Sequence, residues 1–286
     1  MRSSAETHSW DDVVDRLAEI ADASSSAQGR IIIGIDGRCA AGKTTLAQRL
    51  RERLDERFEV EAPVSPTVAS RRPPTLVSSP RLLAAEAGET LSPDSPAPAT
   101  MTPPTAVIPM DHFFLRPEQR TAERFAEPGG NIDYERFSDE VIEPLRAGRP
   151  FSYQPFDCQA GELGAPIEVT PSRVTIVEGS YALHPRFADA YGLSVLLTVD
   201  PDTQRHRLEE RSPGLVDRFE HEWIPLEERY LTATGIAHQV DAIIDTSDGD
   251  TLTVTAVEGE GDGAGIGVTS TTAHAAVVTS TTTPPA

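Results

Sequence analysis

A loop of small residues ends in the only lysine of the chain. Residues 37 to 44 follow the pattern of a glycine, any four residues, and then Gly42, Lys43 and Thr44. Glycines at this spacing let backbone N–H groups turn inward around an anion at the start of a helix. The lysine then reaches the β- and γ-phosphates of a nucleotide, and the threonine hydroxyl binds Mg²⁺. We therefore predict an ATP-binding phosphate loop, whose nucleotide contacts are Gly37, Arg38, Cys39, Ala40, Ala41, Gly42, Lys43, Thr44 and Thr45.

Lysine is absent from the rest of the chain. Lys and Arg together number 25, and all of them except Lys43 are Arg. If Arg has replaced Lys wherever positive charge is enough, Lys43 occupies a position at which Arg fails. A compact ammonium and a planar guanidinium bind phosphate with different geometry. The alternative, a glycine turn that only caps a helix, does not explain why a strand, a helix and the sole lysine coincide.

Two carboxylates are each predicted to follow a strand. Asp111 comes after the apolar run 106–110, and Glu178 ends the run 174–178. Ligands of open parallel sheets bind at the carboxyl ends of the strands. We predict that the two acids flank one Mg²⁺, which Thr44 also binds, and one acceptor hydroxyl. Each acid could instead cap a helix or lie solvated in a loop.

Composition and missing motifs exclude several other classes. A guanine-reading switch needs Asn-Lys-x-Asp, but Asn131, the only asparagine, precedes Ile132, and Lys43 precedes Thr44. The formal net charge of -20 disfavours binding to nucleic acid and to anionic membranes. Two cysteines and scattered histidines make neither a disulfide framework nor a zinc site. Without a signal peptide or a long apolar run, we expect a cytoplasmic protein that binds small molecules, with homo-oligomerisation left open.

Alternating strands and helices are expected to hold these residues in place. Apolar runs predict strands over 30–36, 106–110, 173–177, 193–199 and 240–245. Helices are predicted over 9–22, 42–58, 137–147, 201–211 and 225–238, and residues 151–169 should be extended. The run 30–36 is apolar on both faces, as is typical of a central parallel strand. The sequence therefore predicts an α/β P-loop NTPase fold, a parallel sheet with helices on both faces.

The chain is expected to divide into four parts. Residues 1–28 form an N-terminal helix and linker, in which Ser9 and Asp12 make a capping box. The catalytic domain comprises residues 29–62 and 107–246. Residues 63–106 form a Pro-rich, mostly disordered insertion, and residues 247–286 form a disordered tail rich in Gly, Thr and Ala.

Several segments resemble the uridine kinase and phosphoribulokinase-like family of P-loop kinases. The segments are 37–45, 110–115, 129–137, 177–181 and 205–230, in the same order as in that family. The resemblance covers roughly residues 29–60 and 107–246. It implies a kinase that transfers the γ-phosphate of ATP to a hydroxyl, with uridine or cytidine as the first expectation for the acceptor.

The resemblance also implies roles for individual residues. Asp133 corresponds to an acid that helps bind the nucleoside sugar, and Tyr153 and Phe156 lie in the segment that lines the base pocket. A lid closes cations onto ATP, and the arginines in or beside it are Arg205, Arg207, Arg211 and Arg218. Among these, Arg207 is expected to bind ATP, and Arg211 to join Lys43 and Asp111 in catalysis.

Two departures from the family pattern leave the acceptor open. The segment 156–159 lacks the histidine of uridine kinases, and the lid segment 211–218 lacks the usual Arg-Asp run. The acceptor could therefore be pantothenate, a sugar, a sugar phosphate or another alcohol. A nucleotide-binding regulator with little turnover is a third interpretation, although such a protein would need the phosphate loop without Asp111.

Overall fold

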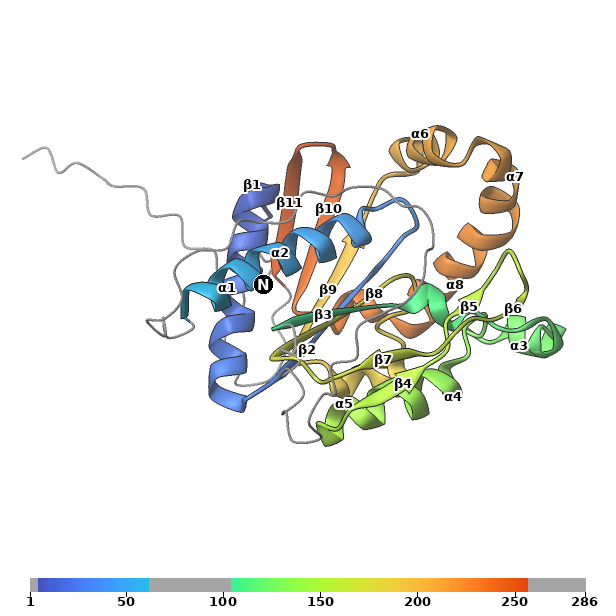
Figure 1. The fold of residues 1–286 in the computed structure, drawn as a ribbon. Helices are drawn as coiled ribbons and strands as arrows, with labels where there is room; N and C mark the ends of the chain where they lie inside the picture. Colours follow the sequence, from blue (N-terminus) through green and yellow to red (C-terminus); the bar gives the residue numbers. More distant parts are fainter. Residues whose placement is uncertain (1–4, 62–103, 257–286) are drawn as a thin grey trace, which may run out of the picture.

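The computed structural model describes residues 5–61 and 104–256. These residues form a seven-stranded sheet with helices on both faces (Figure 1). The predicted Pro-rich insertion, apart from its last residues, and most of the predicted tail lie outside the described residues. No helix in the described ranges has the length and apolar character needed to cross a membrane.

Five neighbouring strands of the sheet are parallel, in the order β10-β9-β2-β8-β3. Two more strands, β11 and then β1, extend the β10 edge in antiparallel orientation. The strands of this sheet are β1 (Glu6–Ser9), β2 (Ile31–Gly37), β3 (Thr105–Pro109), β8 (Val174–Glu178), β9 (Leu193–Thr198), β10 (Ala242–Asp248) and β11 (Thr251–Ala256). Because β2 lies between β8 and β9, the loop that follows β2 starts where the carboxyl ends of three strands meet.

Helices and short ribbons cover this sheet. The α-helices are α1 (Trp10–Gln28), α2 (Lys43–Glu61), α3 (Ala122–Ala126), α4 (Tyr134–Phe137), α5 (Glu143–Ala147), α6 (Pro201–Arg211), α7 (Val216–Arg218) and α8 (Ile224–Thr234). Five-residue π-type turns join α4 to α5 and α7 to α8, at Ser138–Ile142 and Phe219–Trp223. Short 3₁₀ segments lie at Met110–Phe113, Pro117–Gln119, Pro185–Ala190, Pro213–Leu215 and Ile236–His238. As predicted, the segment 151–169 is extended, with β4 (Phe151–Tyr153) paired to β7 (Ile167–Val169) and β5 (Phe156–Asp157) paired to β6 (Glu162–Leu163).

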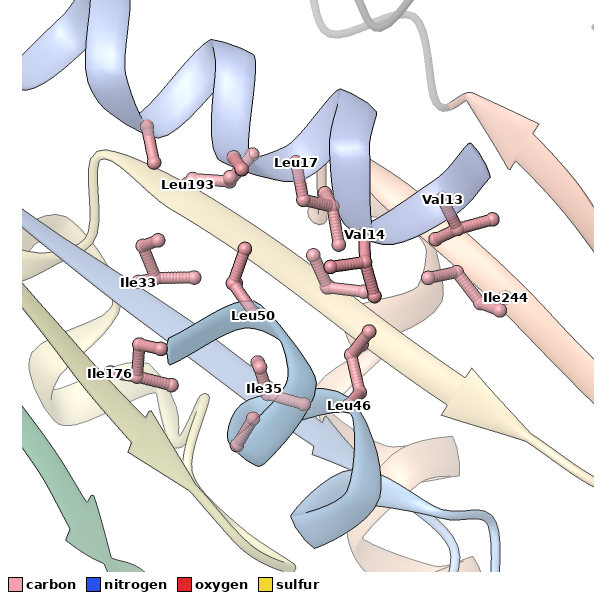
Figure 2. Packing of buried hydrophobic residues seen from close by; sticks show 14 of the residues in the cluster. Val13, Val14, Leu17, Ile33, Ile35, Leu46, Leu50, Ile176, Leu193 and Ile244 are labelled. Carbon is pink, nitrogen blue, oxygen red and sulfur yellow. The ribbon is translucent and has the colours of Figure 1, made fainter. Parts of the chain in front are cut away.

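The period of two along β2 divides the core into two layers. Ile31, Ile33 and Ile35 belong to the cluster under α1 and α2, whereas Ile32 packs against the cluster on the other face. Figure 2 shows the first cluster, with labelled residues Val13, Val14, Leu17, Ile33, Ile35, Leu46, Leu50, Ile176, Leu193 and Ile244. Leu46, Leu50 and Leu54, spaced by four along α2, are fully buried in this cluster. These observations confirm the predicted fold class, with helices on both faces of a mostly parallel sheet.

The N-terminal helix is longer than predicted and belongs to the core. It begins after Ser9, whose side chain accepts from the backbone N–H of Asp12, while the Asp12 carboxylate accepts from the backbone N–H of Ser9. This is the predicted capping box. The helix runs to Gln28 and buries Val13, Val14 and Leu17 against the sheet.

The prediction that the tail begins at residue 247 is wrong. Residues 251–256 form β11, which pairs with β10 on one side and with β1 on the other. Threonines alternate with Leu252 and Val254, and these two apolar side chains are buried in the cluster under α1. The alternation is a strand signal, which the composition of the neighbouring tail hides. β1 was likewise not predicted, since four residues are too few for a periodic pattern.

Candidate active site

The loop between β2 and α2 has the conformation that its glycines allow. Gly37 has a φ of 137°, and a Cβ at this position would lie 2.0 Å from the carbonyl oxygen of Leu197 in β9. A side chain is therefore excluded at the point where the loop leaves the sheet. Gly42 also has a positive φ, and α2 begins at the next residue, Lys43.

Side chains outside the loop hold its carbonyl groups. The carbonyl oxygen of Cys39 accepts from Gln204 Nε2 at 3.0 Å, that of Ala40 from Arg207 at 3.1 Å, and that of Ala41 from the Thr246 hydroxyl at 3.1 Å. In a trans peptide the carbonyl and the next N–H point in opposite directions. Turning the carbonyls of Cys39 and Ala41 toward these side chains therefore directs the N–H groups of Ala40 and Gly42 away from them, as an anion-binding loop requires.

The side chain of Lys43 points back into the loop that precedes it. Its side chain is 9% exposed, and Nζ donates to the carbonyl oxygens of Gly37 and Arg38 at 2.8 Å each, and to Ser180 Oγ at 3.2 Å. An ammonium has three protons and no acceptor, so each proton has a partner. The charge is thus held beside the loop amides, where a phosphate oxygen could replace one of these acceptors.

Thr44 and Glu178 meet at the end of β8. The Thr44 hydroxyl lies 3.3 and 3.2 Å from the two carboxylate oxygens of Glu178. Burial, together with the nearby negative charge of Asp111, raises the pKa of Glu178, against the opposing effects of Thr44 and Lys43. The strand ends therefore bring together the hydroxyl and the two acids that were predicted to bind Mg²⁺.

A single cavity of about 980 Å³ adjoins the loop and both acids. Asp111 lies on the 3₁₀ turn after β3 and is exposed to this space. The volume is near the upper end of that of small-molecule sites, which leaves room for a nucleotide and a second small molecule. The loop residues that line it are Cys39, Ala40, Gly42, Lys43, Thr44 and Thr45. Gly37, Arg38 and Ala41, which were also predicted to contact the nucleotide, are not among the lining residues.

Three of the predicted lid arginines line the cavity. These are Arg207, Arg211 and Arg218, whereas Arg205 pairs with Glu209 and Glu220 outside it. Arg207 has a second task, since its guanidinium donates to the Ala40 carbonyl and to Thr246. The cavity is therefore lined by cations from different elements: Lys43 at the loop, Arg207 and Arg211 of α6, and Arg218 of α7.

The residues predicted to bind the acceptor lie elsewhere. Asp133 is buried, caps α4, accepts from Gln119 Nε2 at 2.8 Å, and lines a separate cavity of about 500 Å³. The Tyr153 hydroxyl lies 3.1 Å from His112 Nδ1, and its ring packs on Phe113. Phe156 is buried, with the Arg120 guanidinium 5.7 Å from its ring centre. Their roles in binding the acceptor remain predictions, because none of the three lines the larger cavity.

Other side chains at the site could not be singled out from the sequence. Asp36 is 1% exposed and accepts from the N–H groups of Gly37, Tyr181 and Leu183 and from the Tyr230 hydroxyl. Burial raises the pKa of its carboxyl. Glu227 of α8 accepts from the Cys39 N–H and from Ser180. Of these two acids, only Asp36 could have been noticed in the sequence, because it ends a predicted buried strand directly before the loop.

Comparison with known proteins supports the fold. No family model matches the sequence, and no curated protein matches it. Among solved structures, a possible uridine kinase from Bacillus stearothermophilus is 16% identical, with a TM-score of 0.46 and coverage of 79% of this chain and 98% of that one. A candidate fructose transport system kinase from Silicibacter sp. TM1040 is 17% identical, with a TM-score of 0.46 and coverage of 74% and 94%.

A third solved structure reaches a TM-score of 0.50. It is YFH7 of Saccharomyces cerevisiae, a candidate P-loop containing kinase with a circular permutation, at 15% identity and with coverage of 77% of this chain and 95% of that one. This likeness shows that the chain shares the fold of P-loop kinases. The resemblance inferred from the sequence is thereby confirmed at the level of the fold.

Proposed function

We propose that this chain is a kinase that transfers the γ-phosphoryl group of ATP to a hydroxyl of a small molecule. One observation carries the proposal: the Thr44 hydroxyl and the Glu178 carboxylate, 3.2 Å apart, share one cavity with Lys43 and Asp111. A protein that only binds nucleotide needs the phosphate loop but does not need Asp111. The additional carboxylate of Asp111, exposed beside the loop, is what a phosphoryl acceptor requires.

Mg²⁺ fits the residues present. Within the described ranges, no group of three or more His, Cys, Asp or Glu side chains could hold a metal ion alone. Mg²⁺ in kinases instead needs one or two protein ligands, and substrate phosphates and waters supply the rest. Thr44 and Glu178 would hold it, with Asp111 nearby, and it would neutralise the charge of the transferring phosphate.

The side chains of the cavity divide the remaining work. Lys43, Arg207, Arg211 and Arg218 line the cavity, and in this proposal they bind the phosphates of ATP. Asp111 orients the acceptor hydroxyl and takes its proton as the new bond forms, since the transition state of phosphoryl transfer is loose. Closure of the lid segment would exclude water from the site. Water would otherwise compete with the acceptor for the phosphoryl group.

For the acceptor we propose a nucleoside first. Aromatic side chains from two segments line the cavity, and they suit stacking on a base: Phe114, Phe125, Phe219 and Trp223. A second candidate, another metabolite alcohol such as pantothenate, a sugar or a sugar phosphate, is favoured by a different observation. Asp133, Tyr153 and Phe156, the expected nucleoside contacts, lie outside this cavity.

A substrate panel tests the proposal. The full chain is incubated with Mg²⁺ and γ-³²P-labelled ATP, and with nucleosides, pantothenate, sugars or sugar phosphates, and transfer is followed by chromatography. We expect acceptor-dependent transfer that Asp111→Asn slows by about 10²-fold or more. ATP binding measured by calorimetry, with no transfer to any acceptor, would instead support a regulator, and absence of ATP binding would reject the proposal as a whole.

A further inference from the structure

A buried glutamate on α8 holds the phosphate loop from the side of the lid. Glu227 is 6% exposed, although a carboxylate that loses its water is costly unless hydrogen bonds replace it. Oε2 accepts from the Cys39 N–H at 2.9 Å, and Oε1 accepts from Ser180 Oγ at 2.6 Å. Each oxygen therefore contacts a different part of the site, one in the loop and one after β8.

The contact with Glu227 determines how Ser180 can interact with Lys43. A hydroxyl has one proton to donate. The Glu227 carboxylate at 2.6 Å takes it in preference to the Gly37 carbonyl at 3.4 Å. The lone pairs of Ser180 Oγ are then available to Lys43 Nζ at 3.2 Å. A chain of hydrogen bonds thus runs from α8 through Ser180 to the only lysine.

The same helix contacts the beginning of the loop at two more places. Glu228 accepts from Arg38 Nε and from its terminal nitrogen, at 2.5 and 2.9 Å. The Tyr230 hydroxyl donates to the buried Asp36 carboxylate at 2.8 Å. Side chains within four residues of α8 therefore bind Asp36, Arg38 and Cys39 in turn. The helix directly follows the turn Phe219–Trp223, in which Phe219, Glu222 and Trp223 line the cavity.

We infer that Glu227 is a positioning residue, which acts through Ser180 to hold Lys43 and through the Cys39 N–H to hold the loop, so that the site is arranged before ATP arrives. Of the three acceptors of Lys43, Ser180 is the most distant, and it is the one whose hydroxyl Glu227 orients. Ordering the loop in advance lowers the entropy lost on binding. The inference rests on the proposed function for its role in catalysis, but not for the hydrogen bonds themselves.

The unique lysine makes a direct test practical. In protein labelled with ¹⁵N-lysine, the side-chain Nζ region of an NMR spectrum contains one signal, from Lys43. We expect slow proton exchange in the wild type and fast exchange in Ser180→Ala and Glu227→Gln. The side-chain amide introduced by Glu227→Gln has a single oxygen, so it cannot accept from both Cys39 and Ser180 as the carboxylate does. Ser180→Thr keeps the hydroxyl and should retain slow exchange.

Binding of ATP and ADP to the same variants, measured by calorimetry, gives the second readout. Loss of a hydrogen bond to a charged group predicts that Kd for ATP rises about tenfold in Ser180→Ala and Glu227→Gln. Ser180→Thr should rescue this loss. Glu209→Gln, which removes an exposed carboxylate of α6 paired with Arg205, is the matched control and should bind as the wild type does.

Several outcomes would overturn the inference. An unchanged Nζ signal in Ser180→Ala means that Ser180 does not hold Lys43. Tighter ATP binding in Glu227→Gln means that the carboxylate competes with phosphate. If the wild type binds no ATP, the proposed function fails, while proton exchange at Lys43 still tests the hydrogen-bond chain. If Glu227→Gln does not fold, Ser180→Ala alone decides the matter, since Ser180 is only half-buried.

Discussion

Lys43 should not be replaceable by arginine. Its ammonium fits between the Gly37 and Arg38 carbonyl oxygens at 2.8 Å, a space formed by the loop itself. A planar guanidinium is larger and would displace the loop. We expect Lys43→Arg to lower turnover by about 10²-fold or more, as misplaced phosphate contacts do. Steady-state rates and calorimetric ATP binding measure the effect.

Arg51→Lys is a matched control for this variant. Arg51 lies on the exposed face of α2 and pairs with Asp55, so an exchange between the two cations should leave turnover unchanged. Near-normal turnover in Lys43→Arg would mean that the sole lysine is not needed for its chemistry. The phosphate loop would then tolerate either cation.

Asp111 should matter for the rate more than for ATP binding. Asp111→Asn keeps the size of the side chain and removes its charge. Removal of a general base typically lowers the rate by about 10²–10⁴-fold. We expect a fall in kcat within this range, with the Kd for ATP changed by no more than several-fold. Rates across a series of Mg²⁺ concentrations, together with calorimetry, provide the measurement.

The Mg²⁺ series separates two roles of Asp111. If Asp111 is mainly a metal ligand, ATP affinity should fall together with the rate, and added Mg²⁺ should restore part of both. Wild-type turnover in Asp111→Asn would remove this residue from the mechanism. It would also remove the main reason to prefer an enzyme to a nucleotide-binding regulator.

How far the site can be predicted from the sequence depends on whether its contacts are local. The phosphate loop is a contiguous pattern, so Lys43 and Thr44 could be placed before the structure was known. Glu227 accepts from Cys39 across 188 positions of the chain, and no periodicity links the two. Asp36 is similar, because its partners Leu183 and Tyr230 come from separate elements.

At the scale of elements, β11 should be essential to the sheet. Leu252 is fully buried in the cluster under α1, and β11 joins β10 to β1. Leu252→Ala should lower the free energy of unfolding by about 2–5 kcal/mol, the usual range for a buried leucine. Urea unfolding would measure this loss of stability, and the m value should be the same in the variant and the wild type. The adjacent exposed substitution Thr251→Ala serves as control, and an equal effect of both variants would contradict the placement of β11.

The N-terminal helix and the β10–β11 turn meet beside the phosphate loop. Trp10 Nε1 donates to the Gly249 carbonyl at 3.1 Å, and a Cβ on Gly42 would lie 3.2 Å from the Trp10 ring. The chain has two tryptophans, and both Trp10 and Trp223 line the cavity. We expect ATP binding to change the intrinsic fluorescence through both residues.

Single variants assign that signal. Trp10→Phe retains the response of Trp223, and Trp223→Phe retains the response of Trp10 beside the loop. ATP titrations of each variant should therefore show part of the wild-type change. A response that survives unaltered in both variants, or is absent from the wild type despite calorimetric binding, would contradict the position of the cavity.

Elements with a continuous apolar run or period could be predicted, whereas the four-residue edge strand β1 could not. The helix 201–211 matches α6, and the ends of the predicted parallel strands deviate by at most three residues. β1 has four residues, and its pairing with β11 joins opposite ends of the chain. Such a strand is stabilised by its neighbour rather than by its own pattern, so only tertiary structure reveals it.

Among the groups that make the stability of the molecule depend on pH, His184 has the most clearly defined surroundings. His184 is buried between the rings of Tyr134 and Tyr230, with ring centres 5.0 and 6.2 Å away, and its Nδ1 accepts from the Arg186 N–H. Burial, and next the charge of Arg186, lowers the pKa of His184 to about 4. The folded state therefore keeps this ring neutral over a range in which the unfolded chain binds a proton.

The sign of the effect follows from this difference in protonation. The stability due to neutral His184 is complete above the ordinary pKa of 6.5 and is lost as pH falls toward about 4. At 1.36 kcal/mol per pKa unit, the loss reaches about 3 kcal/mol. Asp36 and Glu178 act in the opposite direction, because burial raises the pKa of each, so the fold gains stability as they become protonated.

A difference experiment isolates the histidine from these carboxylates. His184→Phe retains a ring between the tyrosines, but this ring cannot bind a proton. The variant should be less stable than the wild type at neutral pH, because the hydrogen bond of the imidazole is lost. Its stability should nevertheless fall less than that of the wild type when the pH is lowered. Urea unfolding of both proteins between pH 7 and pH 4 gives two curves, and their difference should change by about 3 kcal/mol, mostly below pH 6.5. Parallel curves would mean that His184 is protonated in the folded state. The ring would then have to leave its place between Tyr134 and Tyr230, and the packing of α8 against the face opposite α1 would have to change with it.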